Sequence, residues 1–203
     1  MTPEEVRALG RCLAADGVAV FPSDTVYGLA CDPESRRGVE RLYALKGRER
    51  NTPAAVMFFD VDQATTALPE LGEATGTALA ALLPGGATLL LPNPEHRFTL
   101  ACAGDPDTLG LRVPALAGAL APLGVLRKPV LQSSANRSGG PDARRLDEVP
   151  DAIRRGADLV LDAGDLAGTP STVIDLREYE ETGRWAILRR GAVSASEVAA
   201  ALA

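Results

Sequence analysis

The sequence is poor in histidine, lysine and cysteine. Only two of its 21 basic residues are lysines, Lys46 and Lys128, and its single histidine is His96. A Ser-His-Asp hydrolase would have to depend on that one histidine, so we discount this class of enzyme. The three cysteines are widely spaced and form no C-x-x-C pair. This pattern argues against a zinc site and favours a reducing cytoplasm.

Several sequence signatures are also missing. No apolar run approaches the roughly 18 residues of a membrane span. Residues 1–10 are acidic and polar where a secretory signal is basic and then apolar. The chain contains no G-x-G-x-x-G, no G-x-x-x-x-G-K-S/T and no G-x-S-x-G motif, which removes the common phosphate loops and the nucleophile elbow. We expect a cytoplasmic protein without membrane contact.

Composition is that of an ordinary globular protein. Apolar residues make up 46% and charged residues 24% of 203 residues, which suits one domain over 1–203. A chain of this size buries roughly two thirds of its unfolded surface, so it needs no metal or disulfide to fold. The formal net charge is −6, and this disfavours general attraction to nucleic acid or anionic lipid.

Helices and short apolar strands alternate along the chain. The first helix is expected from Pro3, capped by Thr2 and stopped by Gly17. Further helices are expected at 34–45, in two stretches up to 82, and at 116–123, 146–155 and from Ser194 to the end. Strands are expected at 18–21, 54–59, 88–91, 109–113, 129–132, 158–161, 171–176 and 185–189. Such alternation predicts an α/β sheet covered on both faces.

Polar residues gather where the expected strands begin or end. Hydroxyl, amide and guanidinium groups occur at 22–25, 133–136, Arg112, 168–172 and 189–190. Because strand exits in open α/β sheets meet at one rim, these groups would suit a small anionic ligand there. The alternative is that they only serve the turns that follow every strand.

Lys46-Gly47-Arg48 closes the second helix. Cations at a helix C-terminus often do no more than complement the helix dipole. The functional interpretation is a Lys/Arg pair that reaches the phosphates of a nucleotide.

A series of motifs together resembles one known family. The motifs are PSDTVYGLACDP, LYALKGRERNTPAAV, LLPGGATLLL, LGLRVP, SSANRSGGP, STVIDL and ILRRGAVS, in this order between residues 17 and 194. This resembles the YrdC family of L-threonylcarbamoyladenylate synthases. The resemblance implies a twisted, largely buried mixed sheet flanked by helices, with a deep concave ligand cavity. It also implies a single-domain form without the extra C-terminal domain of longer members.

The resemblance also implies an activity. The family condenses L-threonine, bicarbonate or CO2, and ATP into L-threonylcarbamoyladenylate and pyrophosphate. A downstream threonylcarbamoyl transferase complex then modifies adenosine 37 of tRNA. No covalent enzyme intermediate is expected: threonine forms a carbamate that attacks the α-phosphorus of ATP, with Mg2+ on the leaving phosphates and no metal ligand assigned in the chain. Cys31 is expected to be a packed residue.

Nine residues match the family's functional positions. Lys46 and Arg48 are the expected catalytic pair, and they would also bind the nucleotide. The other expected nucleotide contacts are Thr108, Ser134, Asn136 and Arg189. The expected L-threonine contacts are Thr25, Arg112 and Ser171. Replacing Lys46 or Arg48 with Ala should reduce adenylate formation at least a hundredfold and leave the melting temperature nearly unchanged.

Departures from the family pattern leave two alternatives. Met57 stands where some members make a polar contact to threonine, and Arg190 stands where proline is frequent. One alternative is a paralogue with a different nucleotide-dependent reaction. The other is a double-stranded RNA-binding module with weak contacts from basic residues at the cavity rim, which are Arg127, Lys128, Arg137, Arg144 and Arg145. The net negative charge argues against RNA.

Overall fold

The computed structural model describes all 203 residues. Its strands are β1 (Ala19–Pro22), β2 (Tyr27–Cys31), β3 (Ala55–Met57), β4 (Ala87–Pro92), β5 (Thr108–Arg112), β6 (Val130–Ser134), β7 (Leu159–Val160), β8 (Thr172–Asp175) and β9 (Ala186–Arg189). Its α-helices are α1 (Pro3–Ala14), α2 (Arg36–Lys46), α3 (Val61–Ala67), α4 (Glu73–Leu82), α5 (Thr99–Cys102), α6 (Asp151–Gly156), α7 (Tyr179–Thr182) and α8 (Ala195–Ala201). Two 3-10 helices are η1 (Gly118–Val125) and η2 (Leu146–Glu148). None of the helices is long and apolar enough to cross a membrane.

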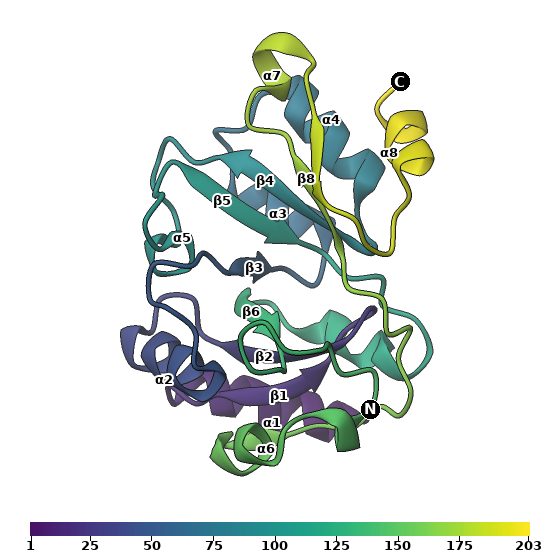
Figure 1. The fold of residues 1–203 in the computed structure, drawn as a ribbon. Helices are drawn as coiled ribbons and strands as arrows, with labels where there is room; N and C mark the ends of the chain where they lie inside the picture. Colours follow the sequence, from purple (N-terminus) through teal and green to yellow (C-terminus); the bar gives the residue numbers. More distant parts are fainter.

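All nine strands form one mixed sheet. Their order is β7-β1-β2-β6-β3-β5-β4-β8-β9. The pairs β1–β7, β3–β5 and β4–β8 are parallel, and the other five pairs are antiparallel. Figure 1 shows α1, α2 and α6 around β1 and β2, and α3, α4 and α8 around β4 and β8. The predicted α/β class and mixed sheet are confirmed.

The two terminal helices follow their local sequence signals. The Thr2 side chain accepts from Glu5 N, and the Glu5 side chain accepts from Thr2 N. Ser194 and Glu197 make the same reciprocal pair at the start of α8. These capping boxes satisfy backbone N–H groups that a helix start otherwise leaves free, which is why both helices were predictable.

Four elements of the structure differ from the sequence-based expectation. No strand was expected at 27–31, where the structure has β2. The short helices α5 and α7 lie in stretches where no helix was expected. The stretch 116–123 forms a 3-10 helix that contains Pro122.

Each face of the sheet carries its own apolar core. One face packs Leu89, Leu111 and Leu131 with the residues of α2 and α4 in a cluster of 32 buried residues. Cys31 lies in this core, and burial raises the pKa of its thiol to about 12, so it is a packed residue as predicted. The opposite face packs Met57 against α1 and η1 in a cluster of 12 buried residues.

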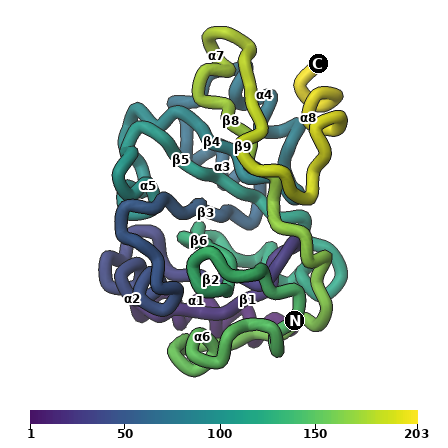
Figure 2. The backbone as a smooth tube through the Cα atoms, in the orientation of Figure 1, coloured from purple at the N-terminus to yellow at the C-terminus, as the bar shows by residue number.

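The second core covers only part of its face. It includes residues of β1, β2, β3 and β6, and no buried residue of β4, β5 or β8. Figure 2 shows the same division, with α1 beside β1 and away from β4 and β5. The uncovered part of this face carries the site described next.

Candidate active site

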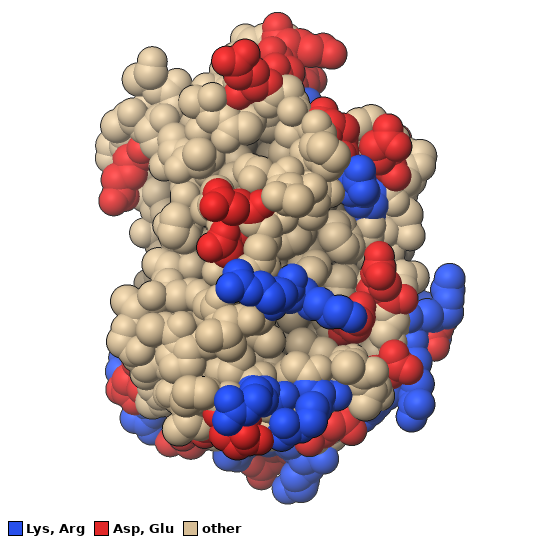
Figure 3. Space-filling model, turned by 180° about the vertical axis from the view of Figure 1, so that it is seen from behind, with Lys and Arg blue, Asp and Glu red and all other residues tan.

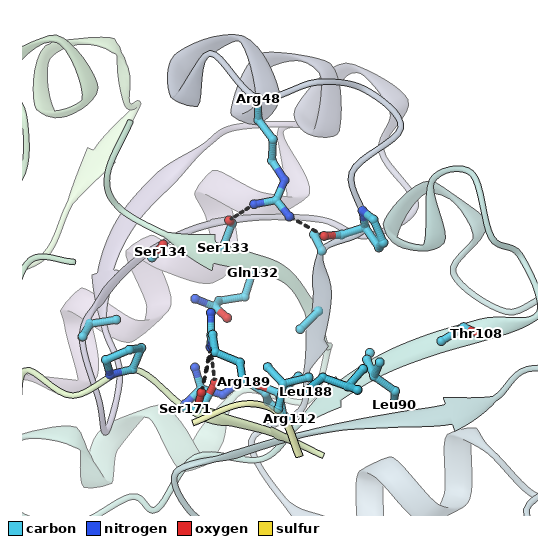
Figure 4. A pocket seen from close by; sticks show the side chains of 18 of the residues that line it. Arg48, Leu90, Thr108, Arg112, Gln132, Ser133, Ser134, Ser171, Leu188 and Arg189 are labelled. Atoms are coloured by element: carbon cyan, nitrogen blue, oxygen red, sulfur yellow. Dashed lines mark hydrogen bonds between the residues drawn. The ribbon is translucent and has the colours of Figure 1, made fainter. Parts of the chain in front are cut away.

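A pocket of about 400 Å3 lies on the open part of the second sheet face. Alternate residues of the strands form its floor, because alternate side chains of a strand share one face. They are Thr88 and Leu90 of β4, Thr108, Gly110 and Arg112 of β5, and Gln132 and Ser134 of β6. Figure 4 shows Arg48 above this floor and Ser171 with Arg189 on the opposite side.

The prediction that the polar residues at the strand ends meet at one edge of the sheet is wrong. Ala55 of β3 pairs with Gly110 of β5 and with Gln132 of β6, and β6 runs antiparallel to β3. Ser134 therefore lies past the Ala55 end of β3, whereas Arg112 pairs with Met57 at the opposite end of β3. The rim rule applies to parallel sheets, whereas here the residues meet because they share a face.

Arg112 is held by a buried ion pair at one end of the pocket. Its Nη2 donates to Asp24 Oδ1 at 2.9 Å and to Thr25 Oγ1 at 3.1 Å. The two charged side chains are only 4% and 8% exposed. Burial lowers the pKa of Arg112, an effect that Asp24 opposes, and burial raises the pKa of Asp24. Arg112 Nε is buried without a hydrogen-bond partner, so this guanidinium has unused donor capacity.

Ser171 connects Arg189 to the floor of the pocket. Arg189 Nη2 donates to the Ser171 carbonyl at 2.8 Å and to its Oγ at 3.1 Å, and Oγ lies 2.7 Å from Thr88 Oγ1. Arg189 lines the pocket and Arg190 does not. This placement agrees with the assignment of Arg189, and not its neighbour, as the candidate ligand-binding arginine.

Arg48 enters the pocket from the end of α2. Gly47 ends the helix in the left-handed conformation, with φ of 59°, and turns the chain directly after Lys46. Arg48 donates from Nη1 to Ser133 Oγ at 3.2 Å and from Nη2 to the Pro53 carbonyl. Its guanidinium carbon lies 5.8 Å from the centroid of the Tyr43 ring. These contacts fix its direction towards the pocket.

Lys46 lies behind the pocket wall. It is 2% exposed, and its Nζ donates to the Ser134 carbonyl, to the Asn136 carbonyl at 3.0 Å and to Asn136 Oδ1 at 2.8 Å. Burial lowers the pKa of Lys46 to about 8, and Arg48 acts in the same direction while Asp142 opposes it. Three acceptors therefore take up the three donors of the ammonium group.

The structure thus divides the nine predicted site residues into two groups. Six line the pocket: Arg48, Thr108, Arg112, Ser134, Ser171 and Arg189. The other three, Thr25, Lys46 and Asn136, are at least nine-tenths buried and contact members of the first group. All nine belong to one connected region, in which six line the pocket and three lie behind its wall.

Sequence reasoning missed several residues of the lining. Gln132, Thr88 and Gly110 each interrupt an apolar strand, two positions from Ser134, Leu90 and Arg112 respectively. For Gln132 and Gly110, the spacing of two residues from the predicted site residues Ser134 and Arg112 was the signal that could have found them. Thr88 carried no such signal, because Leu90 was not a predicted site residue. Arg177, Asp105 and Asp142 lie in loops and carried no such signal.

Charge in the pocket favours an anion. Four arginines line it against two carboxylates: Arg48 and Arg189 form no ion pair, whereas Arg112 pairs with Asp24 and Arg177 pairs with Asp175. Guanidinium groups match carboxylate and phosphate oxygens in geometry as well as in charge. The lining therefore suits a ligand that carries carboxylate and phosphate groups.

Comparison with known proteins agrees with this chemistry. The sequence profile of the Sua5/YciO/YrdC family, described as "Telomere recombination", matches residues 11–191. The chain belongs to the Sua5/YciO/YrdC family. The predicted resemblance is confirmed.

Relatives in the Sua5/YciO/YrdC family include curated enzymes. The threonylcarbamoyl-AMP synthase of Pyrococcus abyssi is 29% identical over 182 residues, which are 89% of this chain and 52% of that protein. The threonylcarbamoyl-AMP synthase of Stutzerimonas stutzeri is 33% identical over 180 residues, 86% of this chain and 94% of that protein. This chain therefore spans about half the length of the first relative and nearly all of the second.

A solved structure matches the whole fold. The crystal structure of P. abyssi Sua5 complexed with L-threonine superposes with a TM-score of 0.85 at 26% identity, over 99% of this chain and 58% of that one. The nine-stranded architecture is thus that of the Sua5/YciO/YrdC family.

Proposed function

We propose that this protein is an L-threonylcarbamoyladenylate synthase. The observation that carries the proposal is the set of four arginines, of which Arg48 and Arg189 form no ion pair, around one pocket of about 400 Å3 in a chain of this family. Relatives named threonylcarbamoyl-AMP synthase, and a neighbour crystallised with L-threonine, support this assignment. The substrates are L-threonine, bicarbonate or CO2, and ATP.

L-threonine binds at the Arg112 end of the pocket. Arg112 takes the carboxylate, and Ser171, whose Oγ is already fixed by Arg189 and Thr88, contacts the amino acid. Thr25 acts indirectly, because its Oγ1 orients Arg112. Met57 is buried in the second core and is absent from the lining, so it is not part of this contact.

ATP binds towards Arg48 and Ser134, with Thr108 and Arg189 as further contacts. Arg48 neutralises phosphate charge as pyrophosphate leaves. Lys46 and Asn136 hold Ser134 in position from behind the wall. In this assignment Lys46 is a positioning residue, whereas its motif alone suggested direct contact with phosphate.

The reaction proceeds in two steps without a covalent enzyme intermediate. The threonine amine and bicarbonate form a carbamate and water. One carbamate oxygen then attacks the α-phosphorus, the bond from that phosphorus to the bridging oxygen breaks, and its electron pair leaves with pyrophosphate. The protein contributes alignment and charge, since the pocket holds no histidine or cysteine.

Mg2+ fits this pocket as an ion that arrives with the triphosphate. No group of three or more His, Cys, Asp or Glu residues could hold a metal alone, but Asp105 and Asp142 line the pocket. One or two carboxylates together with substrate phosphates are the usual environment of Mg2+. Bound there, Mg2+ would neutralise charge on the leaving phosphates.

The product would supply a downstream threonylcarbamoyl transferase complex that modifies tRNA in the cytoplasm. The three free cysteines are compatible with a reducing compartment.

RNA binding is the less favoured function. Arg144 pairs with Asp165 and Arg145 with Asp147, which removes much of their free charge. Figure 3 shows basic and acidic side chains interspersed on the face opposite to that of Figure 1. Arg127 and Lys128 line a separate cavity that also contains Asp32, Glu34, Asp60 and Asp62.

Pyrophosphate release tests the proposal. The purified protein is incubated with ATP, Mg2+ and bicarbonate, with and without L-threonine. Release that requires L-threonine, and that serine and valine do not support, is the expected result. A folded protein that binds ATP but releases no pyrophosphate with threonine would favour a paralogue with another reaction.

A further inference from the structure

Gln132 presents its side-chain amide to the centre of the pocket and has no hydrogen-bond partner in the protein. It is 5% exposed and lines the pocket, and its side chain makes no hydrogen bond to another residue. The amide atoms of Gln132 are open to the pocket and not sealed from solvent, so both the N–H and the C=O are free to bind a ligand there. Figure 4 shows Gln132 between Arg48 and Ser133 on one side and Arg112 and Ser171 on the other.

The neighbouring strands leave space for this amide. The residues paired with Gln132 on β2 and β3 are Ala30 and Ala55, which are both small. A Cβ added to Gly28 would lie 2.9 Å from Gln132 Nε2, closer than real contacts allow. The absence of a side chain at Gly28 therefore lets the amide lie beside Ser134, the register partner of Gly28.

We propose that Gln132 binds the carbamate that forms from threonine and inorganic carbon. This inference rests on the proposed function, in which the carbamate carbon lies between the threonine amine and the α-phosphate. Gln132 occupies the corresponding place, between the Arg112 end and the Arg48 end of the pocket. The site is therefore a subsite for bicarbonate or CO2 as it is captured.

Amide and carbamate are complementary in hydrogen bonding. The Gln132 N–H donates to a carbamate oxygen, and its C=O accepts from the carbamate N–H. A neutral amide accepts this anion without the repulsion that a carboxylate would produce. Binding in this way holds the carbamate against loss of CO2 and directs its second oxygen towards phosphorus. The covalent steps stay those given above: amine and bicarbonate give carbamate and water, and the carbamate oxygen displaces pyrophosphate.

The test compares Gln132→Met with the wild type and with Gln63→Met. Methionine keeps the approximate size of glutamine and removes both hydrogen-bonding functions. Gln63 is the matched control because it is the only other glutamine of the chain and lines a different cavity. Apparent KM for bicarbonate is measured in CO2-depleted buffer at saturating threonine and ATP, and Kd for threonine and for ATP is measured separately without inorganic carbon.

Gln132→Met should raise the KM for bicarbonate about tenfold or more, with both Kd values within about twofold of wild type. Gln63→Met should leave all three constants unchanged. An unchanged bicarbonate KM in folded Gln132→Met, or an equal weakening of threonine and ATP binding, overturns the inference. Wild-type protein without threonine-dependent pyrophosphate release instead refutes the synthase proposal, and this inference with it.

Discussion

Lys46 donates two hydrogen bonds to Asn136. Nζ of Lys46 donates to the backbone carbonyl of Asn136 at 3.0 Å and to its side-chain Oδ1 at 2.8 Å. The same Oδ1 accepts from Ser134 Oγ at 2.8 Å, and Asn136 Nδ2 donates to the Gly140 carbonyl. One buried ammonium group thus fixes the turn that follows β6 and sets the direction of Ser134 towards the pocket.

This position changes what a Lys46 variant should do. Lys46→Met leaves buried carbonyl groups at Ser134 and Asn136 without this donor, at a cost of roughly 1–3 kcal/mol each. We expect the melting temperature to fall by about 4 °C or more and ATP affinity to fall at least tenfold. Differential scanning calorimetry and titration calorimetry measure the two effects.

Arg48→Ala provides the contrast. Arg48 is part of the pocket wall, so its removal should reduce the rate of pyrophosphate release about a hundredfold or more and leave the melting temperature nearly unchanged. If Lys46→Met kept the wild-type melting temperature and lost only activity, Lys46 would act directly on the ligand, as its motif suggested.

Lys46 should also make stability depend on pH. Its pKa is about 8 in the folded protein against 10.5 when unperturbed, so the unfolded chain binds this proton more tightly. Between these values the unfolded state carries more protons, and the free energy of unfolding therefore rises with pH. Relative to Lys46→Met, wild-type stability should rise by up to about 1.4 kcal/mol per pH unit above pH 8. Urea unfolding of both proteins from pH 7 to 9.5 measures the difference.

Tyrosine and carboxylate titrations cancel in that comparison, because both proteins share them. A difference between the two proteins that stays constant across this range would mean that Lys46 holds its proton equally well in the folded and unfolded states.

Arg189 and Arg190 are adjacent and differ in their relation to the pocket. Both are exposed, but only Arg189 lines the pocket and reaches Ser171. Arg189→Ala should weaken ATP binding about tenfold, through loss of a charged hydrogen bond, with little change in melting temperature. Arg190→Ala is the matched control and should bind ATP like wild type. Equal losses in both variants would point to general charge attraction instead of a defined contact.

Local signals in the sequence predicted most of the helices and strands, but not which strands lie next to each other in the sheet. Thr2 with Glu5 and Ser194 with Glu197 act within one helical turn, so the starts of α1 and α8 are readable from sequence. The placement of β6 between β2 and β3 depends on contacts between residues about a hundred positions apart, which no local pattern encodes.

The same limit applies to the site. Motifs predicted Lys46, Asn136 and Thr25 as ligand contacts, because a motif does not reveal which side of the wall a residue occupies. Gln132 was overlooked because a polar residue in a short strand indicates a site only when its face of the sheet is known to be uncovered, and the sequence does not show this.

The buried pair of Asp24 and Arg112 allows function to be separated from stability. Asp24→Asn leaves the Arg112 charge buried without its counter-ion, so we expect a loss of about 3 kcal/mol in the free energy of unfolding. Adding Arg112→Gln removes that charge, and the double variant should be more stable than Asp24→Asn alone. Denaturant unfolding of the two single variants and the double variant measures this coupling.

Threonine binding should respond differently in the same three variants. Arg112→Gln and the double variant lose the carboxylate partner and should bind L-threonine at least tenfold more weakly by titration calorimetry. A double variant that recovered stability and also kept threonine affinity would remove Arg112 from the proposed amino-acid site. If the double variant recovers stability but does not bind L-threonine, the buried charge of Arg112 is unfavourable for folding and is required for binding the ligand.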